Sequence, residues 1–502
     1  MIKKSKDHSD LFRRSVKGGF WVFFLRYAGH VLGFVKTIVI ANLMFVDDYG
    51  IMTATLLMVE FLTTLSETGY YSALIQKKDQ IHDYLDTAWT VAIFRGVLLF
   101  LLLYFLSPLF ASFRIAPDKQ ELAVSVMRMM GGCFLISGFS NIGIIHFSRD
   151  INFRPLTFVK IAEILIDIVI SITLVVIYRS IWAYVAGWLI SGLFGCIMGY
   201  VICDYRPRLK LDFAKARELW QFGKWIYYLT IIGFIIRCGE SYFVWGILGV
   251  NALGIYRLAY RYSTLPATEI TNVIGQVLFP AFSKLQDDLP RLKEAYLKVL
   301  RLTSFLTVPM AFGLAVVGPD FVRLVFKPEL HAMIPAMQIL AFKGLYWSIG
   351  GTRAPLIQAL GKPHINWHYS LFRLIILAIT AYPLTKYWGM AGAGVSTLLM
   401  GVLINPLDFH LVCRLLKAGI WEMYRPFFYP LTASMVMAAV LWFLKYTVLT
   451  ETTILNFCMS IVFGISVYLF LMWGLDKITN YGIRQNLVEL VRILPFNRGF
   501  KW

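Results

Sequence analysis

The sequence is short of charged residues, which make up only 15% of its 502 positions. Soluble domains carry about 25% charged residues and about 45–50% apolar residues. This chain has 58% hydrophobic residues and a mean hydropathy of +0.66. Such a composition excludes an ordinary soluble protein of several domains and is typical of a chain that crosses a membrane many times.

Catalytic and metal-binding motifs are also missing. The six cysteines form no CxxC pair, and most lie in apolar runs, so we interpret them as packing residues rather than metal ligands or disulfides. There is no P-loop, and the glycine-rich run at residues 389–394 follows no strand and is interpreted as close helix packing. We therefore expect a transporter rather than an enzyme, with no catalytic residue, metal or cofactor.

Acidic residues are scarce beside basic ones, with 29 Asp and Glu against 48 Lys and Arg, for a net charge of +19. A nucleic-acid-binding protein would gather such charges on one soluble face. Here most basic residues fall in short connectors between apolar runs, where they set membrane orientation. The excess of basic residues is thus explained by membrane orientation, and we expect no nucleic-acid partner.

Apolar runs of about 20 residues predict an all-α polytopic membrane protein with about fourteen transmembrane helices. Basic connectors alternate along the chain, so the positive-inside rule predicts that both termini are cytoplasmic. The predicted parts are a basic N-terminal tail (1–16), a six-helix bundle (17–203), a basic connector (204–221), a second six-helix bundle (222–412), two appended helices (413–474) and an amphipathic tail on the membrane surface (475–502).

The two predicted bundles resemble each other at an offset of 204 positions. Trp21 matches Trp225, and Gly50 matches Gly254, without a gap. Because six spans separate the matching helices, the repeats are predicted to run parallel and to be related by a pseudo-twofold axis along the membrane normal. Transporters of this organisation place their substrate at the interface between repeats.

Charged residues inside the predicted spans are the candidate site, because an unpaired charge in the bilayer is costly. Arg257 and Arg261 share a helix face with Tyr260, and guanidinium groups bind phosphate bidentately, so a diphosphate suits them. The alternative is that both arginines reach the membrane interface. The predicted substrate cavity comprises Arg26, Lys36, Glu60, Arg237, Glu240, Arg257, Tyr260 and Arg261.

Spacing suggests how these charges pair. Arg237 and Glu240 lie three apart on one face and are predicted to pair, for function or for structure alone. Lys36 matches Glu240 through the repeat, which suggests an ion pair across the cavity. Glu163 and Asp167, on one face of the fifth span, are with Glu240 the candidates for coupling to H+ or Na+. For the two carboxylates of the fifth span, the alternatives are solvation in a cavity and pairing with Lys160. Three more charges are expected to line the second bundle: Lys343, Arg353 and Asp408.

Four segments resemble a known family. They are YGIMTATLLMVEFLTTLSETGYYSALIQKKD (49–79), RPRLKLDF (206–213), LGIYRLAYRYSTLP (253–266) and LFPAFSKLQDD (278–288). They are similar to the lipopolysaccharide and colanic-acid exporter branch of the polysaccharide flippases, in the multidrug/oligosaccharidyl-lipid/polysaccharide (MOP) superfamily. In that family's motifs, Arg237 and Arg261 match an arginine, whereas Glu240 stands where an aspartate is usual.

This resemblance implies transport of undecaprenyl-diphosphate-linked oligosaccharide repeat units across the bacterial inner membrane by alternating access. It implies as partners the lipid-linked oligosaccharide, membrane lipids, and a polysaccharide polymerase with chain-length proteins. A peptidoglycan lipid-precursor flippase remains an alternative with similar substrate chemistry. A cation-coupled drug antiporter is disfavoured because the cavity helices carry more Arg and Lys than Glu. A membrane-embedded glycan ligase or polymerase is disfavoured because the predicted outer loops are short.

Overall fold

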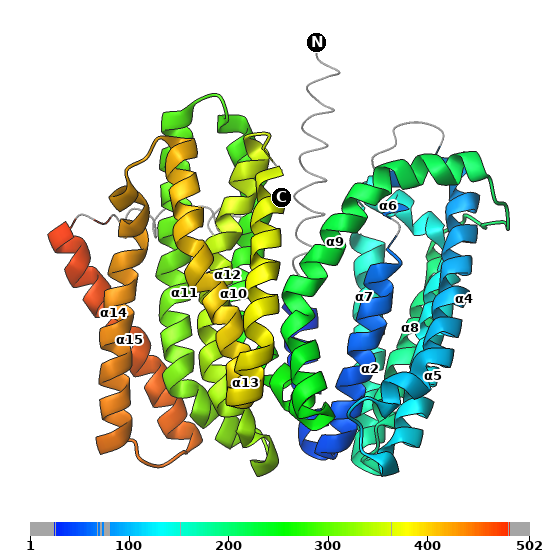
Figure 1. The fold of residues 1–502 in the computed structure, drawn as a ribbon, viewed down its shortest axis with the longest axis horizontal. Coiled ribbons are helices and arrows are strands. Elements are labelled where there is room, and N and C mark those ends of the chain that lie inside the picture. The colour runs from blue at the N-terminus through cyan, green and yellow to red at the C-terminus, as the bar shows by residue number, and fades with distance from the viewer. Residues whose placement is uncertain are drawn as a thin grey trace, which may run out of the picture. The chain divides into compact units, whose positions relative to one another are not determined.

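The computed structural model describes residues 25, 27–67, 69–70, 73–74, 81–150, 152–362, 364–479 and 481. Throughout these ranges the regular structure is helical (Figure 1). Within the same ranges, nine helices are long and apolar enough to cross a membrane. The prediction of an all-helical, multi-pass membrane protein is confirmed, while the figure of about fourteen spans stays a prediction.

Two features lower the number of helices that qualify by length and composition. Helix α2 (Val46–Leu65) begins with Asp47 and Asp48 and carries Glu60, so its charge content is high for a span. Helix α13 (His364–Leu416) runs for 53 residues, but Gly389 interrupts it with non-helical angles of φ 60° and ψ −141°. Because about 20 residues cross the hydrocarbon, α13 is long enough for two spans.

Contacts divide the chain into two compact units. Unit 1 comprises residues 1–235 and 249–254. It contains an apolar helix (Tyr27–Leu43), α2, α4 (His82–Ser112), η1 (Pro117–Lys119), α5 (Gln120–Gly138), η2 (Ile142–Ile144), α6 (Ile145–Arg149), α7 (Arg154–Tyr178), α8 (Trp182–Ile202) and the first part of α9 (Phe213–Leu248).

Glycines let the helix pairs of unit 1 approach closely. A Cβ added at Gly96 of α4 would lie 2.5 Å from the carbonyl oxygen of Phe134 in α5. A Cβ at Gly138 of α5 would lie 3.0 Å from the carbonyl oxygen of Ala92 in α4. Small residues at such crossings are the usual means of tight packing between membrane helices.

Two residue pairs with the spacing of the sequence repeat lie in contact inside unit 1. The side chain of Asn251 donates a 2.5 Å hydrogen bond to Asp47, and the two residues are 204 positions apart. A Cβ added at Gly254 would lie 3.0 Å from the Cα of Gly50, its match in the repeat. The glycines that the repeat singled out therefore allow a close backbone approach.

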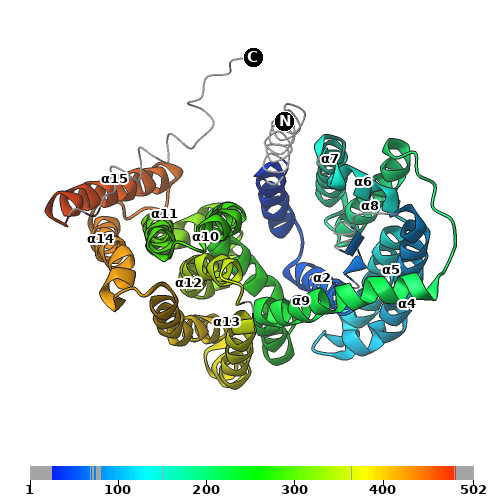
Figure 2. The same ribbon diagram turned by 90° about the horizontal axis from the view of Figure 1, so that it is seen from above.

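Unit 2 comprises residues 236–248 and 255–502. It contains the rest of α9, α10 (Val250–Leu285), α11 (Leu289–Val325), η3 (Pro328–Met333), α12 (Ile334–Ala359), α13, α14 (Ile420–Thr447) and α15 (Ile454–Thr479). Helix α11 packs against α12, α14 and α15, and Figure 2 shows α14 and α15 at one edge of this unit.

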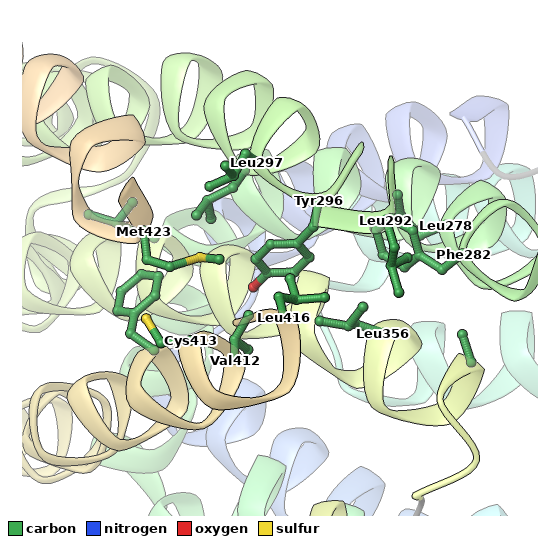
Figure 3. Close-up of a cluster of buried hydrophobic side chains, with 14 of the residues drawn as sticks. Leu278, Phe282, Leu292, Tyr296, Leu297, Leu356, Val412, Cys413, Leu416 and Met423 are labelled. Atoms are coloured by element: carbon green, nitrogen blue, oxygen red, sulfur yellow. The ribbon is translucent and has the colours of Figure 1, made fainter. Parts of the chain in front are cut away.

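A core of buried side chains joins α10, α11, α12, α13 and α14 in unit 2 (Figure 3). Phe282 and Tyr296 lie with ring centroids 6.1 Å apart, and Leu356, Val412 and Met423 pack around them. Such burial excludes both water and lipid. The core therefore packs together the helices α12 and α13, which carry charged residues.

Candidate functional site

Unit 1 holds an ion pair between the helix Tyr27–Leu43 and α7. The ammonium of Lys36 lies 2.6 Å and 2.7 Å from the two carboxylate oxygens of Asp167. It also lies 4.1 Å from the ring centroid of Tyr184 at the start of α8, a cation–π geometry. The Lys36 side chain is 8% exposed and that of Asp167 is 21% exposed, so the carboxylate keeps access to a bound ion or water.

Glycines on α8 make room for the acidic face of α7. A Cβ at Gly187 would lie 2.0 Å from the Ser171 hydroxyl oxygen, and one at Gly195 would lie 1.9 Å from a Glu163 oxygen. The step from Gly187 to Gly195 along α8 matches the step from Ser171 back to Glu163 along α7. The two helices therefore pack antiparallel. Ser171 in turn donates a 3.2 Å hydrogen bond to Asp167. Glu163 and Asp167, four residues apart in the sequence, therefore lie on the face of α7 that packs against glycines of α8.

A cavity of about 470 Å³ opens beside this face. It lies among α5, α7 and α8, with Gly192, Gly195 and Gly199 on the α8 side. Glu163 lines it and pairs with Lys160 at 2.6 Å. Pairing with Lys160 was one of the alternatives left open for both carboxylates. Glu163 forms this pair, whereas Asp167 pairs with Lys36.

Unit 2 holds a second ion pair, between α9 and α12. The ammonium of Lys343 lies 2.5 Å from Glu240 Oε1, and the two side chains are 1% and 0% exposed. Lys343 also lies 4.4 Å from the ring centroid of Tyr260. Among the described residues, Glu240 Oε2 and the Tyr256 hydroxyl are buried and have no hydrogen-bond partner.

One predicted pairing changes and one stays a prediction. Local spacing suggested Arg237 for Glu240, whereas the structure pairs Glu240 Oε1 with Lys343 inside unit 2. The pairing of Lys36 with Glu240 that the repeat suggested would join the two units and stays a prediction; inside unit 1, Lys36 pairs with Asp167. The partners are 131 residues apart for Lys36 and Asp167 and 103 apart for Glu240 and Lys343, so no local sequence pattern identifies them.

The remaining predicted residues take different environments. Arg237 on α9 and Arg261 on α10 are exposed, while Arg257 is partly buried, 5.7 Å from the ring of Tyr260. Glu60 on α2 is partly buried. Arg26 lies outside the described residues.

A third charged cluster joins α12 to both halves of α13. Arg353 pairs with Asp408, and Arg373 Nη2 lies 3.3 Å from the other Asp408 oxygen. Arg353 stacks 4.7 Å from the Tyr369 ring, and Arg373 lies 5.6 Å from the Tyr346 ring. The sequence placed Arg353 and Asp408 in the second bundle but missed Arg373, whose only signal is a charge within an apolar run.

No group of three His, Cys, Asp or Glu side chains that suits a metal occurs within the ranges that the structure describes. The charged pairs are acid–base pairs on helices, which suits binding of ionic ligands rather than nucleophilic chemistry.

Comparison with solved structures defines the class of this fold. It is similar to a lipid II flippase MurJ in an inward closed conformation, with a TM-score of 0.73, 16% identity, and coverage of 92% of this chain and 99% of that one. It is also similar to an inward-facing multidrug resistance MATE transporter of the MOP superfamily, with a TM-score of 0.61, 13% identity, and coverage of 78% and 96%. The class that these likenesses define is a fold, the all-helical multi-pass membrane fold that MurJ and MATE transporters share.

The particular family follows from the sequence match. The family described as "Polysaccharide biosynthesis protein" matches residues 39–335, so the chain belongs to that family of flippase-like proteins. Lipopolysaccharide biosynthesis protein WzxC of Escherichia coli (strain K12) is 24% identical over 395 residues, or 78% of this chain and 80% of that protein. Teichuronic acid biosynthesis protein TuaB of Bacillus subtilis (strain 168) is 22% identical over 469 residues, covering 92% and 95%.

Proposed function

We propose that the protein is a flippase that moves undecaprenyl-diphosphate-linked oligosaccharide repeat units across the bacterial inner membrane by alternating access. The family match supports a transport role in polysaccharide biosynthesis, and the two relatives above are named for lipopolysaccharide and teichuronic acid biosynthesis. In this proposal both termini are cytoplasmic, the two repeats are related by a pseudo-twofold axis, and the exported polymer is a surface polysaccharide.

The observation that carries the proposal is the exposure of arginines on α9 and α10 in unit 2. Arg237 and Arg261 are exposed, Arg257 is partly exposed, and Arg237 lies in the candidate span Thr230–Leu248. An arginine at membrane depth is costly against acyl chains and is tolerated in a water-filled cavity or against an anion. A diphosphate offers several oxygens for bidentate guanidinium contacts, and Tyr260 supplies a neighbouring ring for a sugar.

The ion pair of unit 1 is proposed as the coupling site. Asp167 is partly exposed, and Glu163 lines the 470 Å³ cavity, so a proton or Na+ has a route to carboxylates on α7. An ion bound at Asp167 would weaken its pairing with Lys36 and so link the ion to the position of the helix Tyr27–Leu43. Glu240 is a weaker coupling candidate because Lys343 closes it off completely, and we propose that it positions α9 instead.

Deletion of the gene in its source bacterium tests the proposed function. We expect undecaprenyl-diphosphate-linked repeat units to accumulate on the cytoplasmic face and surface polysaccharide to be lost. Restoration by the wild-type gene, but not by an Arg237→Gln/Arg261→Gln variant of equal abundance, would tie transport to the arginines. Normal surface polysaccharide in a strain without a second flippase gene would contradict the proposal.

The identity of the lipid that accumulates distinguishes the proposed function from a peptidoglycan-precursor flippase. Accumulation of the peptidoglycan precursor, with arrest of cell-wall synthesis, would assign the protein to that substrate instead. Both outcomes keep a diphosphate lipid as the cargo, so the role of the arginines is tested in either case.

A further inference from the structure

A basic segment of unit 1 is not explained by transport of a substrate. Residues 203–212 join α8 to α9 without regular secondary structure, and we call them the connector. The connector follows a predicted span that ends at Ile202 and lies along the first turns of α4, whose span begins at His82. It therefore lies near one membrane face, which the positive-inside rule predicts to be cytoplasmic.

The connector is fastened to α4 mainly through its backbone. The amide of Arg208 donates to Asp86 at 2.9 Å, the amide of Lys210 donates to the Thr90 hydroxyl at 3.0 Å, and the Thr90 hydroxyl donates back to the Lys210 carbonyl at 3.2 Å. The amide of Asp212 donates to Thr87 at 3.3 Å. Because backbone groups make these bonds, the side chains are left to face outward.

Tyr205 adds a side-chain anchor at the start of the connector. Its hydroxyl donates to Asp86 at 2.5 Å, and its carbonyl accepts from Asn141 at 2.9 Å. Burial and the hydrogen bond to Asp86 raise the pKa of Tyr205 well above its usual value, so it stays a neutral donor. One carboxylate, Asp86, thus holds both the Tyr205 hydroxyl and the Arg208 amide.

The start of α9 continues the attachment. Lys215 donates to the carbonyl of Asp83 at 3.2 Å, and the Tyr84 hydroxyl donates to Glu218 at 2.6 Å. Leu219 is buried in a small apolar cluster with Leu85. Figure 1 shows the first part of α9 lying across the end of unit 1 before the helix bends. The connector is therefore fixed at both of its ends.

The outward side chains alternate between basic and apolar. Arg208 and Lys210 are exposed, and neither side chain forms a hydrogen bond or ion pair with the residues that the structure describes. Leu209, Leu211 and Phe213 are 73%, 42% and 79% exposed. Exposed leucine and phenylalanine in water would forfeit the stabilisation that burial gives them. Basic and large apolar side chains side by side are instead typical of segments at a membrane interface.

We propose that the connector binds the head groups of anionic phospholipids through Arg208 and Lys210, while Leu209, Leu211 and Phe213 enter the acyl-chain boundary. A soluble polyanion would leave the three apolar side chains in water. The attachment to α4 then ties unit 1 to an anionic membrane surface.

Two basic residues at the start of α11 in unit 2 provide a matched control. Arg291 lies 3.3 Å from Asp288, and Lys293 lies 2.5 Å from Glu422. These cations already have carboxylate partners, so we expect them to bind an anionic head group more weakly. A double substitution to glutamine at either place removes two positive charges from the protein, so the two variants have the same net charge.

The test measures lipid binding by the full-length protein in detergent, using native mass spectrometry with phosphatidylglycerol or phosphatidylcholine. We expect Arg208→Gln/Lys210→Gln to weaken phosphatidylglycerol binding about 25-fold, at about fivefold per cation, and to leave phosphatidylcholine binding unchanged. High salt should remove the difference from wild type. Arg291→Gln/Lys293→Gln should bind both lipids like the wild type, and all variants should unfold at the same temperature.

An equal loss in both double variants, or no loss in either, would overturn the proposal. A second variant, Leu209→Asn/Phe213→Asn, should weaken both lipids to a similar extent, because it removes acyl-chain contacts; unchanged binding would remove the apolar half of the proposal. If undecaprenyl diphosphate shows the 25-fold loss and phosphatidylglycerol does not, the connector belongs to the substrate path instead. None of these measurements depends on the proposed transport activity.

Discussion

The two units solve the same electrostatic problem with opposite polarity. Position 36 in unit 1 is a lysine, and its match in the repeat 204 positions later, in unit 2, is Glu240. Each finds an opposite charge within its own unit, Asp167 and Lys343 respectively. Neutrality is thus kept at both positions while the sign of the charge on the first helix is reversed.

The two pairs differ most in their access to solvent. In unit 2 the side chains of Lys343 and Glu240 are 1% and 0% exposed, whereas in unit 1 Asp167 is 21% exposed. A sealed pair holds helices together, because removing either partner leaves an uncompensated buried charge. A partly open pair can exchange its partner for an ion. This contrast leads us to assign a structural role to the pair in unit 2 and a coupling role to the pair in unit 1.

The largest effect on stability is expected from breaking the sealed pair. Glu240→Gln leaves Lys343 as an unpaired buried cation, which should cost about 3–5 kcal/mol of unfolding free energy. Thermal unfolding of the purified protein and its abundance in membranes would measure this. The double variant Glu240→Leu/Lys343→Met removes both charges and should recover most of the loss. If the double variant is no more stable than the single one, the ion pair is not the cause.

A smaller effect is expected from the open pair. Asp167→Asn removes a charged hydrogen-bond partner of Lys36 and should cost about 1.5–3 kcal/mol, less than in unit 2 because water reaches the site. Transport of the lipid-linked oligosaccharide should lose its dependence on the proton or Na+ gradient. Ser171→Ala, which removes only the hydroxyl that donates to Asp167, should keep that dependence. Gradient-dependent transport by Asp167→Asn would rule out Asp167 as the coupling residue.

The register of α7 and α8 can be tested with two alanines. Gly195→Ala places a Cβ 1.9 Å from Glu163, so the carboxylate must move away from Lys160, at a cost of about 1–3 kcal/mol of overpacking. Gly192→Ala, one turn earlier, meets its nearest atom in Ile136 at 3.8 Å and should be tolerated. Equal unfolding temperatures for the two variants would argue against this packing of α8.

The smallest effect on stability is expected at the exposed arginines of unit 2. Arg261→Gln should change the unfolding free energy by less than about 0.5 kcal/mol, because an exposed side chain loses little on substitution. Transport should nevertheless fall about tenfold or more, since a charged hydrogen bond to phosphate contributes about 1.5–3 kcal/mol. Arg323→Gln, at another exposed arginine on α11, is the control and should transport normally. Equal transport by both variants would remove Arg261 from the substrate site.

Sequence patterns were enough to identify the helices and several of the charged residues. Long apolar runs predict membrane helices because the bilayer leaves backbone groups no partners except their own helix. The same reasoning makes any charge in such a run conspicuous, which is why Lys36, Asp167, Glu240 and Lys343 could all be noticed. The repeat also predicted the equivalence of Gly50 and Gly254, which lie in contact.

Pairing was beyond the reach of sequence patterns. Local spacing favoured Arg237 as the partner of Glu240. The partner in the structure, Lys343, lies 103 residues away on α12. Arg373 was overlooked for a related reason, because its role depends on Asp408, which lies beyond the break at Gly389 in α13.

The sequence by itself determined that this chain forms membrane helices, that basic connectors alternate along it, and that a small set of charges lies within apolar spans. These follow from local physical chemistry, since hydrophobic length and charge are properties of each segment. Only the tertiary structure decided which charges are neutralised, which stay open and which connector side chains face outward. Those outcomes depend on packing between distant helices, because a carboxylate and an ammonium stabilise each other only when the fold brings them within hydrogen-bonding distance.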